Sequence, residues 1–332
     1  MDAIWLLPVL AGILNGTAWS LTSIFKRLPA AYFTGASFIV AGLLACVWVG
    51  VEGVPKEIAP NYWSVLLLNA LLLAVAFTLA NAAPRVSDLT LARPINPLCS
   101  VLMFVSGPVL ASLGVAAVWS TPNAWGTVGI VIMVASLIFL AFSGTKTAEP
   151  SSASRAAKYR GMLMMLVVVV LYSITSFYDL IALRASSSAF YLATIFLLIG
   201  LVCLVLGALD RSFFFLHLEE RREDYRNCWS LRNVAPCVLF GALYFSATAL
   251  HMVTIDATSH IFYVVAIKEG LTAIDSAVVT IVLIKGVAWR LWTLPEGVYR
   301  DKEKEYRALP LRFPPMVGVA LGIFVVLLFG IR

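Results

Sequence analysis

The chain has 332 residues, of which 61% are hydrophobic and only 13% are charged, with a formal net charge of +6. Soluble domains typically carry about 25% charged residues, so this composition excludes an ordinary soluble domain. Apolar runs of about 20 residues, each enough to cross a hydrocarbon core of roughly 30 Å as a helix, recur along the whole length. The sequence therefore predicts an all-α polytopic membrane protein.

Ten transmembrane helices are expected from these runs. In chain order they cover residues 4–25, 31–49, 62–83, 89–113, 124–142, 161–182, 188–209, 234–255, 259–284 and 313–331. The stretch 143–160, SGTKTAEPSSASRAAKYR, interrupts the pattern, and its small and basic residues are typical of a flexible cytoplasmic linker. It divides the chain into two regions of five expected spans each, residues 1–142 and 161–332.

The basic residues of the loops indicate an orientation. Of the 24 Lys and Arg residues, only Lys56, Arg184 and Arg332 fall in the loops and terminus on one side of the expected membrane, and nearly all others fall on the opposite side. Cytoplasmic loops carry the excess of Lys and Arg, so both termini are expected outside the cell. This distribution also explains the basic pI without a nucleic-acid partner.

Five spans in each region would insert the two regions upside down relative to each other. This inverted-repeat plan is typical of secondary transporters, whose solute site lies between the repeats near the membrane midplane. Short segments align between the regions: SIFKR (23–27) with LIALR (180–184), and LARPINPL (91–98) with AIKEGLTA (266–273). The second alignment places Arg93 opposite Lys268.

The ninth expected span carries the charges that are costliest at membrane depth. Lys268 is nine residues from the start of this span, about 14 Å at 1.5 Å per residue. At 100° per residue, Lys268, Thr272 and Asp275 form one polar stripe that we expect to face the interior of the bundle. Glu269 projects about 100° away from Lys268, so we expect its partner on a neighbouring helix, with Arg93 as one candidate.

Further polar residues are candidates to line a solute cavity. Asn15 lies near the middle of the first span, and Tyr172 is its approximate counterpart in the sixth. Asn96 lies between Pro94 and Pro97, which remove helix hydrogen bonds and are tolerated at depth where a helix lines a cavity. Interhelical hydrogen bonds are the alternative for these polar side chains, a proline kink for the fourth span, and headgroup anchoring for Arg93.

Two further polar groups lie toward the outer ends of the expected spans. Asp179, near the outer end of the sixth span, is expected at the membrane interface. His251, Asp256 and His260 surround the turn between spans eight and nine. Their spacing alone does not make a metal site, which needs a fixed ligand geometry with a supported second shell. We expect neither a metal nor a cofactor.

Two segments carry a family resemblance. ANAAPRVSDLTLARPINPL (80–98) and IDATSHIFYVVAIKEGLTAIDSAV (255–278) resemble the corresponding parts of EamA-type proteins, which belong to the drug/metabolite transporter superfamily. The resemblance implies ten helices in two inverted five-helix repeats and transport of small organic solutes. Glu269 departs from the family pattern, which often has Arg at that position and a doubly basic pair.

These observations favour a secondary transporter that moves a small polar or anionic metabolite by alternating access. Coupling to protons would run through Glu269 or Asp275, and exchange of solutes is the alternative. The expected partners are the solute and the lipid bilayer, with a homodimer left open, in a multi-pass protein of a bacterial inner membrane. A nontransporting receptor or scaffold, an intramembrane enzyme and a channel are the competing functions. The sequence has no nucleophile–base or H-E-x-x-H pattern.

Overall fold

The computed structural model describes residues 3–24, 28–86, 95–103, 106, 123–145, 152–213, 231–258, 261–286 and 309–326. These residues are helical almost throughout, and no strand occurs among them. The helices are η1 (Ala3–Trp5), α1 (Leu6–Ile24), α2 (Ala30–Glu52), α3 (Tyr62–Val86), α6 (Ala124–Thr145), α7 (Ser152–Arg184), α8 (Ser188–Phe213), α9 (Leu231–Ala257), α10 (Ile261–Gly286) and α13 (Leu309–Val325).

The apolar runs predict most of these helices to within a few residues. Five helices, α2, α3, α7, α8 and α9, are long and apolar enough to cross a membrane, and α1, α6 and α13 contain shorter apolar stretches. The fourth expected span, 89–113, lies largely outside the described residues; within it, 95–97 form a turn and 98–103 are helical. The all-helical, membrane-type fold class is therefore confirmed at this level.

The two ends of the expected linker 143–160 are helical, and residues 146–151 lie outside the described residues. Residues 143–145 end α6, and residues 152–160 form the first turns of α7. Ala153, Ala156 and Ala157, together with the basic residues beside them, are good helix formers, so helix α7 extends beyond its apolar part.

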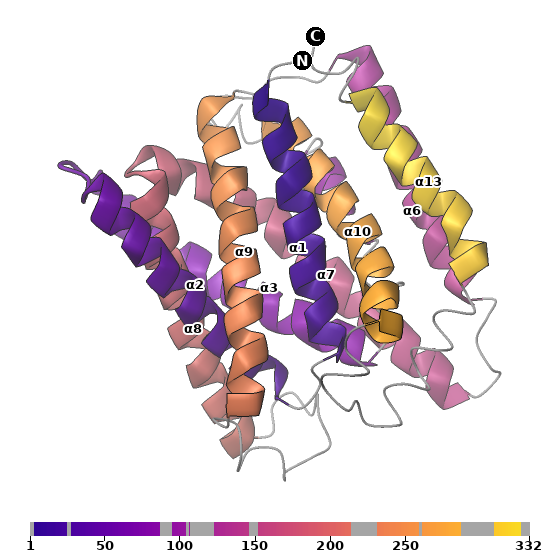
Figure 1. Ribbon diagram of the computed structural model, residues 1–332, viewed down its shortest axis with the longest axis horizontal. Helices are drawn as coiled ribbons and strands as arrows, with labels where there is room; N and C mark the ends of the chain where they lie inside the picture. Colours follow the sequence, from indigo (N-terminus) through magenta and orange to yellow (C-terminus); the bar gives the residue numbers. More distant parts are fainter. Residues whose placement is uncertain are drawn as a thin grey trace.

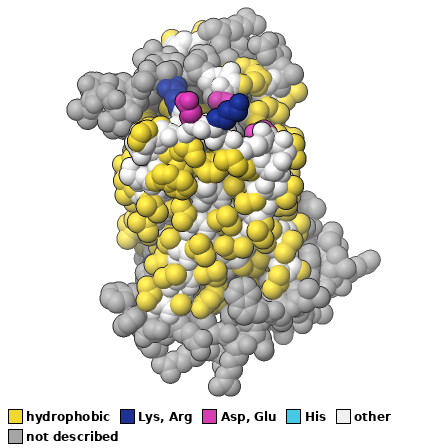
Figure 2. Space-filling view, turned by 90° about the vertical axis from the view of Figure 1, so that its left-hand side faces the viewer, with side chains coloured by type: hydrophobic (Ala, Val, Ile, Leu, Met, Phe, Trp, Pro, Cys, Tyr) yellow, Lys and Arg dark blue, Asp and Glu magenta, His cyan; other side chains and the backbone are white. Residues whose placement is uncertain are grey.

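The outer surface of the bundle is apolar. Large hydrophobic side chains such as Val47, Leu67, Leu163 and Val205 are more than half exposed. Figure 2 shows a broad hydrophobic band along the side of the molecule, with the visible charged side chains gathered above it at one end. Exposed apolar area of this extent marks a surface that meets lipid or another apolar partner.

The helices form a bundle whose upper end, as drawn in Figure 1, carries the start of α1 and the 53–61 loop. We call the opposite end, where α1 ends and α2 begins, the lower end. Helix α1 packs against α9 and α10, α3 packs against α7 and α8, and α2 packs against α8 and α9. Helices α6 and α13 pack mainly on each other and lie at one side, next to α10 (Figure 1).

A glycine sets the close approach of α1 to α10. A Cβ atom at Gly12 would lie 2.7 Å from Leu271 Cβ and 2.9 Å from the Lys268 carbonyl oxygen. Only a residue without a side chain fits there, as is common where membrane helices pack closely. Gly12 therefore holds α1 against the turn of α10 that carries Lys268.

Candidate functional site

A cavity lies in the centre of the bundle, between α1, α3, the 95–99 segment and helices α7 to α10. Its volume is about 70 Å³, counted as space open to the centre of a water molecule. One water needs roughly 10–15 Å³ by the same measure, so the cavity has room for a handful of waters or a small solute. The cavity is lined by Asn15, Trp19, Leu73, Phe77, Asn96, Cys99, Tyr172, Thr175, Ser176, Asp179, Tyr191, Leu192, Ile195, Phe196, Ile199, Tyr244, Thr248, His251, Met252, Val265, Lys268 and Glu269.

Lys268 and Glu269 form an ion pair in this cavity. Lys268 Nζ lies 3.1 Å from Glu269 Oε1, and both side chains are largely buried. Asn96 Nδ2 donates a hydrogen bond of 3.4 Å to Glu269 Oε2. Glu269 thus meets Lys268 of its own helix, which the sequence did not predict, while its expected pairing with Arg93 falls outside the described residues. The two long side chains start about 100° apart on α10 but bend toward each other into the same space.

The polar stripe of α10 faces α1 below Lys268. Asn15 Nδ2 donates a hydrogen bond of 3.0 Å to Thr272 Oγ1, and Thr17 Oγ1 donates one of 3.0 Å to Asp275 Oδ2. Thr272 and Asp275 are not among the described residues that line the cavity, whereas Lys268 and Asn15 are. Thr272 and Asp275 therefore join α10 to α1, and their assignment to the solute site stays a prediction.

Asp179 lies in the cavity wall, whereas its place near the outer end of the sixth span suggested the membrane interface. Tyr191 of α8 donates a short hydrogen bond to Asp179 Oδ1. Asn69 Nδ2 of α3 donates hydrogen bonds of 2.6 Å to Asp179 Oδ1 and 2.9 Å to the Tyr191 hydroxyl. Tyr191 and Asn69 are fully buried. Three helices therefore hold one carboxylate in a fixed position at the cavity wall.

His251 is a second cavity residue that the sequence did not reveal, since it was grouped with Asp256 and His260 around the turn after the eighth span. Helix α9 continues to Ala257, and His251 lies inside the bundle, 5% exposed. Its Nδ1 has no hydrogen-bond partner within the part of the chain that the structure describes. Asp256 is exposed, and His260 lies outside the described residues. Within the described part of the chain, no cluster of three potential metal ligands occurs.

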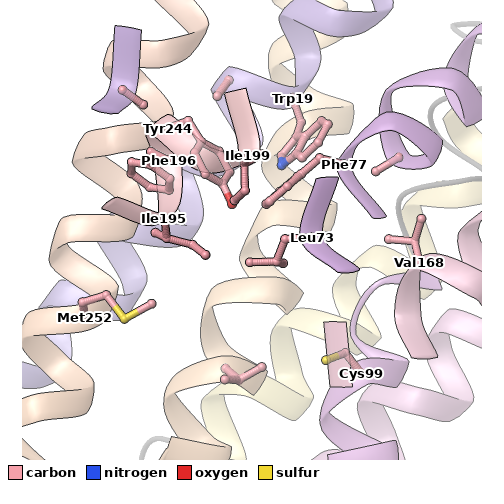
Figure 3. Close-up of a cluster of buried hydrophobic side chains, with 14 of the residues drawn as sticks. Trp19, Leu73, Phe77, Cys99, Val168, Ile195, Phe196, Ile199, Tyr244 and Met252 are labelled. Carbon is pink, nitrogen blue, oxygen red and sulfur yellow. The ribbon is translucent and has the colours of Figure 1, made fainter. Parts of the chain in front are cut away.

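Aromatic rings form one wall of the cavity (Figure 3). Trp19 stacks on Phe77 at a centroid distance of 6.2 Å and meets Tyr244 edge-on at 6.3 Å. Phe77 and Tyr244 are 5.5 Å apart, and Phe38 packs behind both, at 4.5 Å from Phe77 and 5.1 Å from Tyr244. We call Trp19, Phe38, Phe77 and Tyr244 the aromatic layer. Buried aromatic residues from four helices could not be placed together from the sequence.

The charged groups and the aromatic layer lie at different depths. Asp179, His251 and Lys268 are five, six and seven residues from the upper ends of α7, α9 and α10, which is about 8–10 Å at 1.5 Å per residue. Trp19 and Tyr244 are each 13 residues from the upper ends of α1 and α9, about 20 Å by the same rise. The polar part of the cavity is therefore nearer the upper end, and the aromatic layer lies between it and the lower end.

The remaining candidates divide into two groups. Tyr172 lines the cavity as expected, with its ring 5.5 Å from that of Phe77, and Asn96 lines it as well. Arg93 lies outside the described residues, and so does Pro94. The structure thus brings Lys268, Glu269 and these two cavity residues together with Asn15 in one space.

Comparisons with known proteins support the fold. No protein-family model matches the sequence, and no curated protein matches it. A solved structure described only as "Crystal structure of protein" covers 100% of this chain with 99% of its own length, at a TM-score of 0.60 and 14% sequence identity. At this identity the likeness shows a shared fold over the full chain and nothing about activity.

Proposed function

We propose that the protein is a secondary transporter that moves a small organic metabolite across a membrane by alternating access. The observation that carries the proposal is the central cavity, in which charged side chains lie inside a bundle with an apolar outer surface. Intramembrane charges are costly and usually mark a path for solutes or ions. The resemblance of segments 80–98 and 255–278 to EamA-type proteins of the drug/metabolite transporter superfamily agrees with this function.

The helix neighbours support two equivalent halves. We assign α1, α2, α3, 98–103 and α6 to the first half, and α7, α8, α9, α10 and α13 to the second. In this order each helix of one half has a counterpart in the other, for example α1 and α7. If every helix is replaced by its counterpart, the α1–α9 contact becomes α7–α3 and the α2–α9 contact becomes α8–α3. All four of these contacts occur. In the α2–α8 and α6–α13 pairs, each helix packs against its own counterpart, and both pairs are closely packed.

The helix directions support an inverted relation between these halves. In the α2–α8 pair, Gly207 faces Tyr32 while Gly42 faces Leu197, so the two helices run antiparallel. In the α6–α13 pair, Gly318 faces Ser136 while Gly129 faces Val326, which is again antiparallel. A helix that pairs with its own counterpart runs antiparallel to it when the two-fold axis lies in the membrane plane, as in inverted-repeat transporters.

The cavity lies where such halves would move against each other. Its wall combines Asn15, Phe77 and Asn96 of the first half with Asp179, His251 and Lys268 of the second. The aromatic layer would close the path toward the lower end, on which the basic loops are expected, and its opening would expose the cavity to the cytoplasm. A bound solute would meet both halves and favour movement of one against the other.

Counterflow into proteoliposomes tests the proposal. Vesicles containing the full-length protein are loaded with unlabelled metabolites and assayed for uptake of each labelled compound, with Lys268→Ala and Glu269→Gln as cavity variants. We expect saturable counterflow of at least one metabolite and a changed rate or preference in both variants. Folded protein that moves no compound under any gradient contradicts transport, and flux that neither variant alters contradicts the assigned site.

A further inference from the structure

Asp179 has one carboxylate oxygen with no partner among the described residues. Both of its hydrogen bonds, from Tyr191 and from Asn69, reach Oδ1, and Oδ2 receives none from the described part of the chain. Asp179 lines the cavity. Tyr191 and Asn69 therefore fix the carboxylate through one oxygen and leave the other available to a group in the cavity.

Two more acceptors in the cavity wall receive no hydrogen bond from the described part of the chain. His251 Nδ1 and Asn96 Oδ1 are both buried and have no partner among those residues. A neutral histidine that carries its proton on Nε2 accepts through Nδ1, and Asn96 already uses its Nδ2 group on Glu269. Buried acceptors without donors are costly, so a ligand that supplies N–H groups would be favoured here.

The charges around these acceptors favour a positive ligand. The ammonium group of Lys268 is paired with Glu269 at 3.1 Å, so this pair is neutral as a unit. Among the described lining residues, Asp179 is the carboxylate that forms no ion pair, although the charge of Lys268 also acts on it through space. An anion in the cavity would therefore meet the Asp179 carboxylate, whereas a cation would be attracted to it.

The wall between the polar part and the aromatic layer is apolar. Leu73 and Ile199 line the cavity there, each 11 residues from the upper end of its helix, α3 or α8, and Figure 3 shows both beside the rings of the aromatic layer. A ligand with a polar head at Asp179 would place the rest of its body against these side chains. Its body should therefore be apolar, and an aromatic ring would also find ring partners.

We propose that the cavity binds a primary or secondary organic ammonium with an apolar body, which donates N–H groups to Asp179 Oδ2 and His251 Nδ1. This inference rests on the proposed function, since it names the class of the transported solute. An organic ammonium therefore replaces the anionic metabolite among the expected solutes, because an anion would be suggested by the charge of Lys268 considered without its partner Glu269. A quaternary ammonium has the charge but no N–H group, and a carboxylate has the wrong charge; both should bind poorly.

Three matched probes test the inference: phenethylammonium, its N,N,N-trimethyl analogue, and phenylpropionate. Binding to the purified full-length protein in detergent is measured by equilibrium dialysis. We expect phenethylammonium to bind at least about tenfold more tightly than the other two, the size of one charge-assisted hydrogen bond. Asp179→Asn should weaken its binding by at least about tenfold, and His251→Ala should weaken it less.

The control variant is Asp256→Asn, which removes an exposed carboxylate from the upper end of α9. It should bind phenethylammonium like the wild type. Asp179→Asn is the same size as the native residue, and elution as a single species with wild-type helix content shows that it is folded. Equal binding of the trimethyl analogue or phenylpropionate, no binding of any probe, or unchanged binding by Asp179→Asn would overturn the inference.

The two proposals fail in different ways. Counterflow of another solute by a protein that does not bind phenethylammonium leaves transport standing and overturns the ligand class. Tight, Asp179-dependent binding of phenethylammonium without flux of any compound supports the ligand class and contradicts transport, and it favours a receptor.

Discussion

Lys268 and Glu269 are consecutive residues of α10, yet their side chains meet in an ion pair of 3.1 Å inside the central cavity. The pair belongs to a single helix, so it does not itself join the two proposed halves of the bundle. The described residues link it to the proposed first half by the hydrogen bond of 3.4 Å from Asn96 to Glu269.

Replacing one member of the ion pair should destabilise the protein more than replacing both members together. In Lys268→Ala, the Glu269 carboxylate stays buried without its cation, and we expect the free energy of unfolding to fall by roughly 3 kcal/mol. The double variant Lys268→Met, Glu269→Gln should recover most of this loss, because no unpaired charge remains. Unfolding in mixed micelles measures both, and equal losses in the single and double variants would contradict the pairing.

Close packing of α1 on α10 predicts a large effect at Gly12. A Cβ atom there would lie 2.7 Å from Leu271 Cβ and 2.9 Å from the Lys268 carbonyl oxygen, so Gly12→Ala should destabilise the protein by about 1–3 kcal/mol. Gly50 is the control, because a Cβ atom there meets nothing within 4 Å. Gly50→Ala should leave the melting temperature in detergent unchanged or raised, and equal losses at both positions would refute the argument.

The hydrogen bond from Asn15 to Thr272 links α1 and α10 in a fully buried position. Thr272→Val removes the acceptor at nearly constant volume, and we expect it to cost about 0.6–1.7 kcal/mol, the range for hydrogen bonds between membrane helices. Ser246→Ala provides the control, because Ser246 is exposed and bonds the backbone of its own helix. The melting temperature should fall in Thr272→Val alone.

The aromatic layer should keep water from reaching the cavity from the lower end. Cys99 lines the cavity and is 2% exposed, so it reports on access in a variant whose other four cysteines are replaced by serine. Trp19→Ala removes the largest ring of the layer and should speed the reaction of Cys99 with a polar methanethiosulfonate reagent severalfold.

Trp63→Ala is the matched control for that experiment, because Trp63 is half exposed on the outer surface. It should leave the rate of Cys99 labelling unchanged. Equal acceleration by both tryptophan variants would show that the rate reflects general loosening of the bundle and would contradict a closing role for Trp19.

The sequence predicts the helices better than it predicts their contacts. Apolar runs of about 20 residues are a direct consequence of membrane thickness, and the bounds of α2, α3 and α8 differ from the expected spans by only a few residues. The same reasoning did not predict the helical conformation of 152–160, because the Ser and basic residues there are also typical of loops, whereas helix α7 includes them. Composition therefore predicts which segments are apolar enough for a membrane helix, but it predicts the first residue of a helix less well.

The site was predicted only in part, for a geometric reason. Lys268, Asn15 and Tyr172 were found because they are polar residues deep in apolar spans. Asp179 was missed because its depth alone suggested the interface, whereas its partners Asn69 and Tyr191 come from two other helices. These partners come together only through tertiary packing, and the contacts between distant helices cannot be read from a single sequence.

The central claim, transport through the buried cavity, is tested most directly by comparing exchange with net efflux. Proteoliposomes are loaded with a labelled solute identified by counterflow, and its efflux is measured with and without the same unlabelled solute outside. An alternating-access carrier predicts faster efflux with external solute, and a marked loss of this acceleration in Lys268→Ala but not in Asp256→Asn. Efflux that is unaffected by external solute, or equally accelerated in Lys268→Ala and the wild type, would contradict the account.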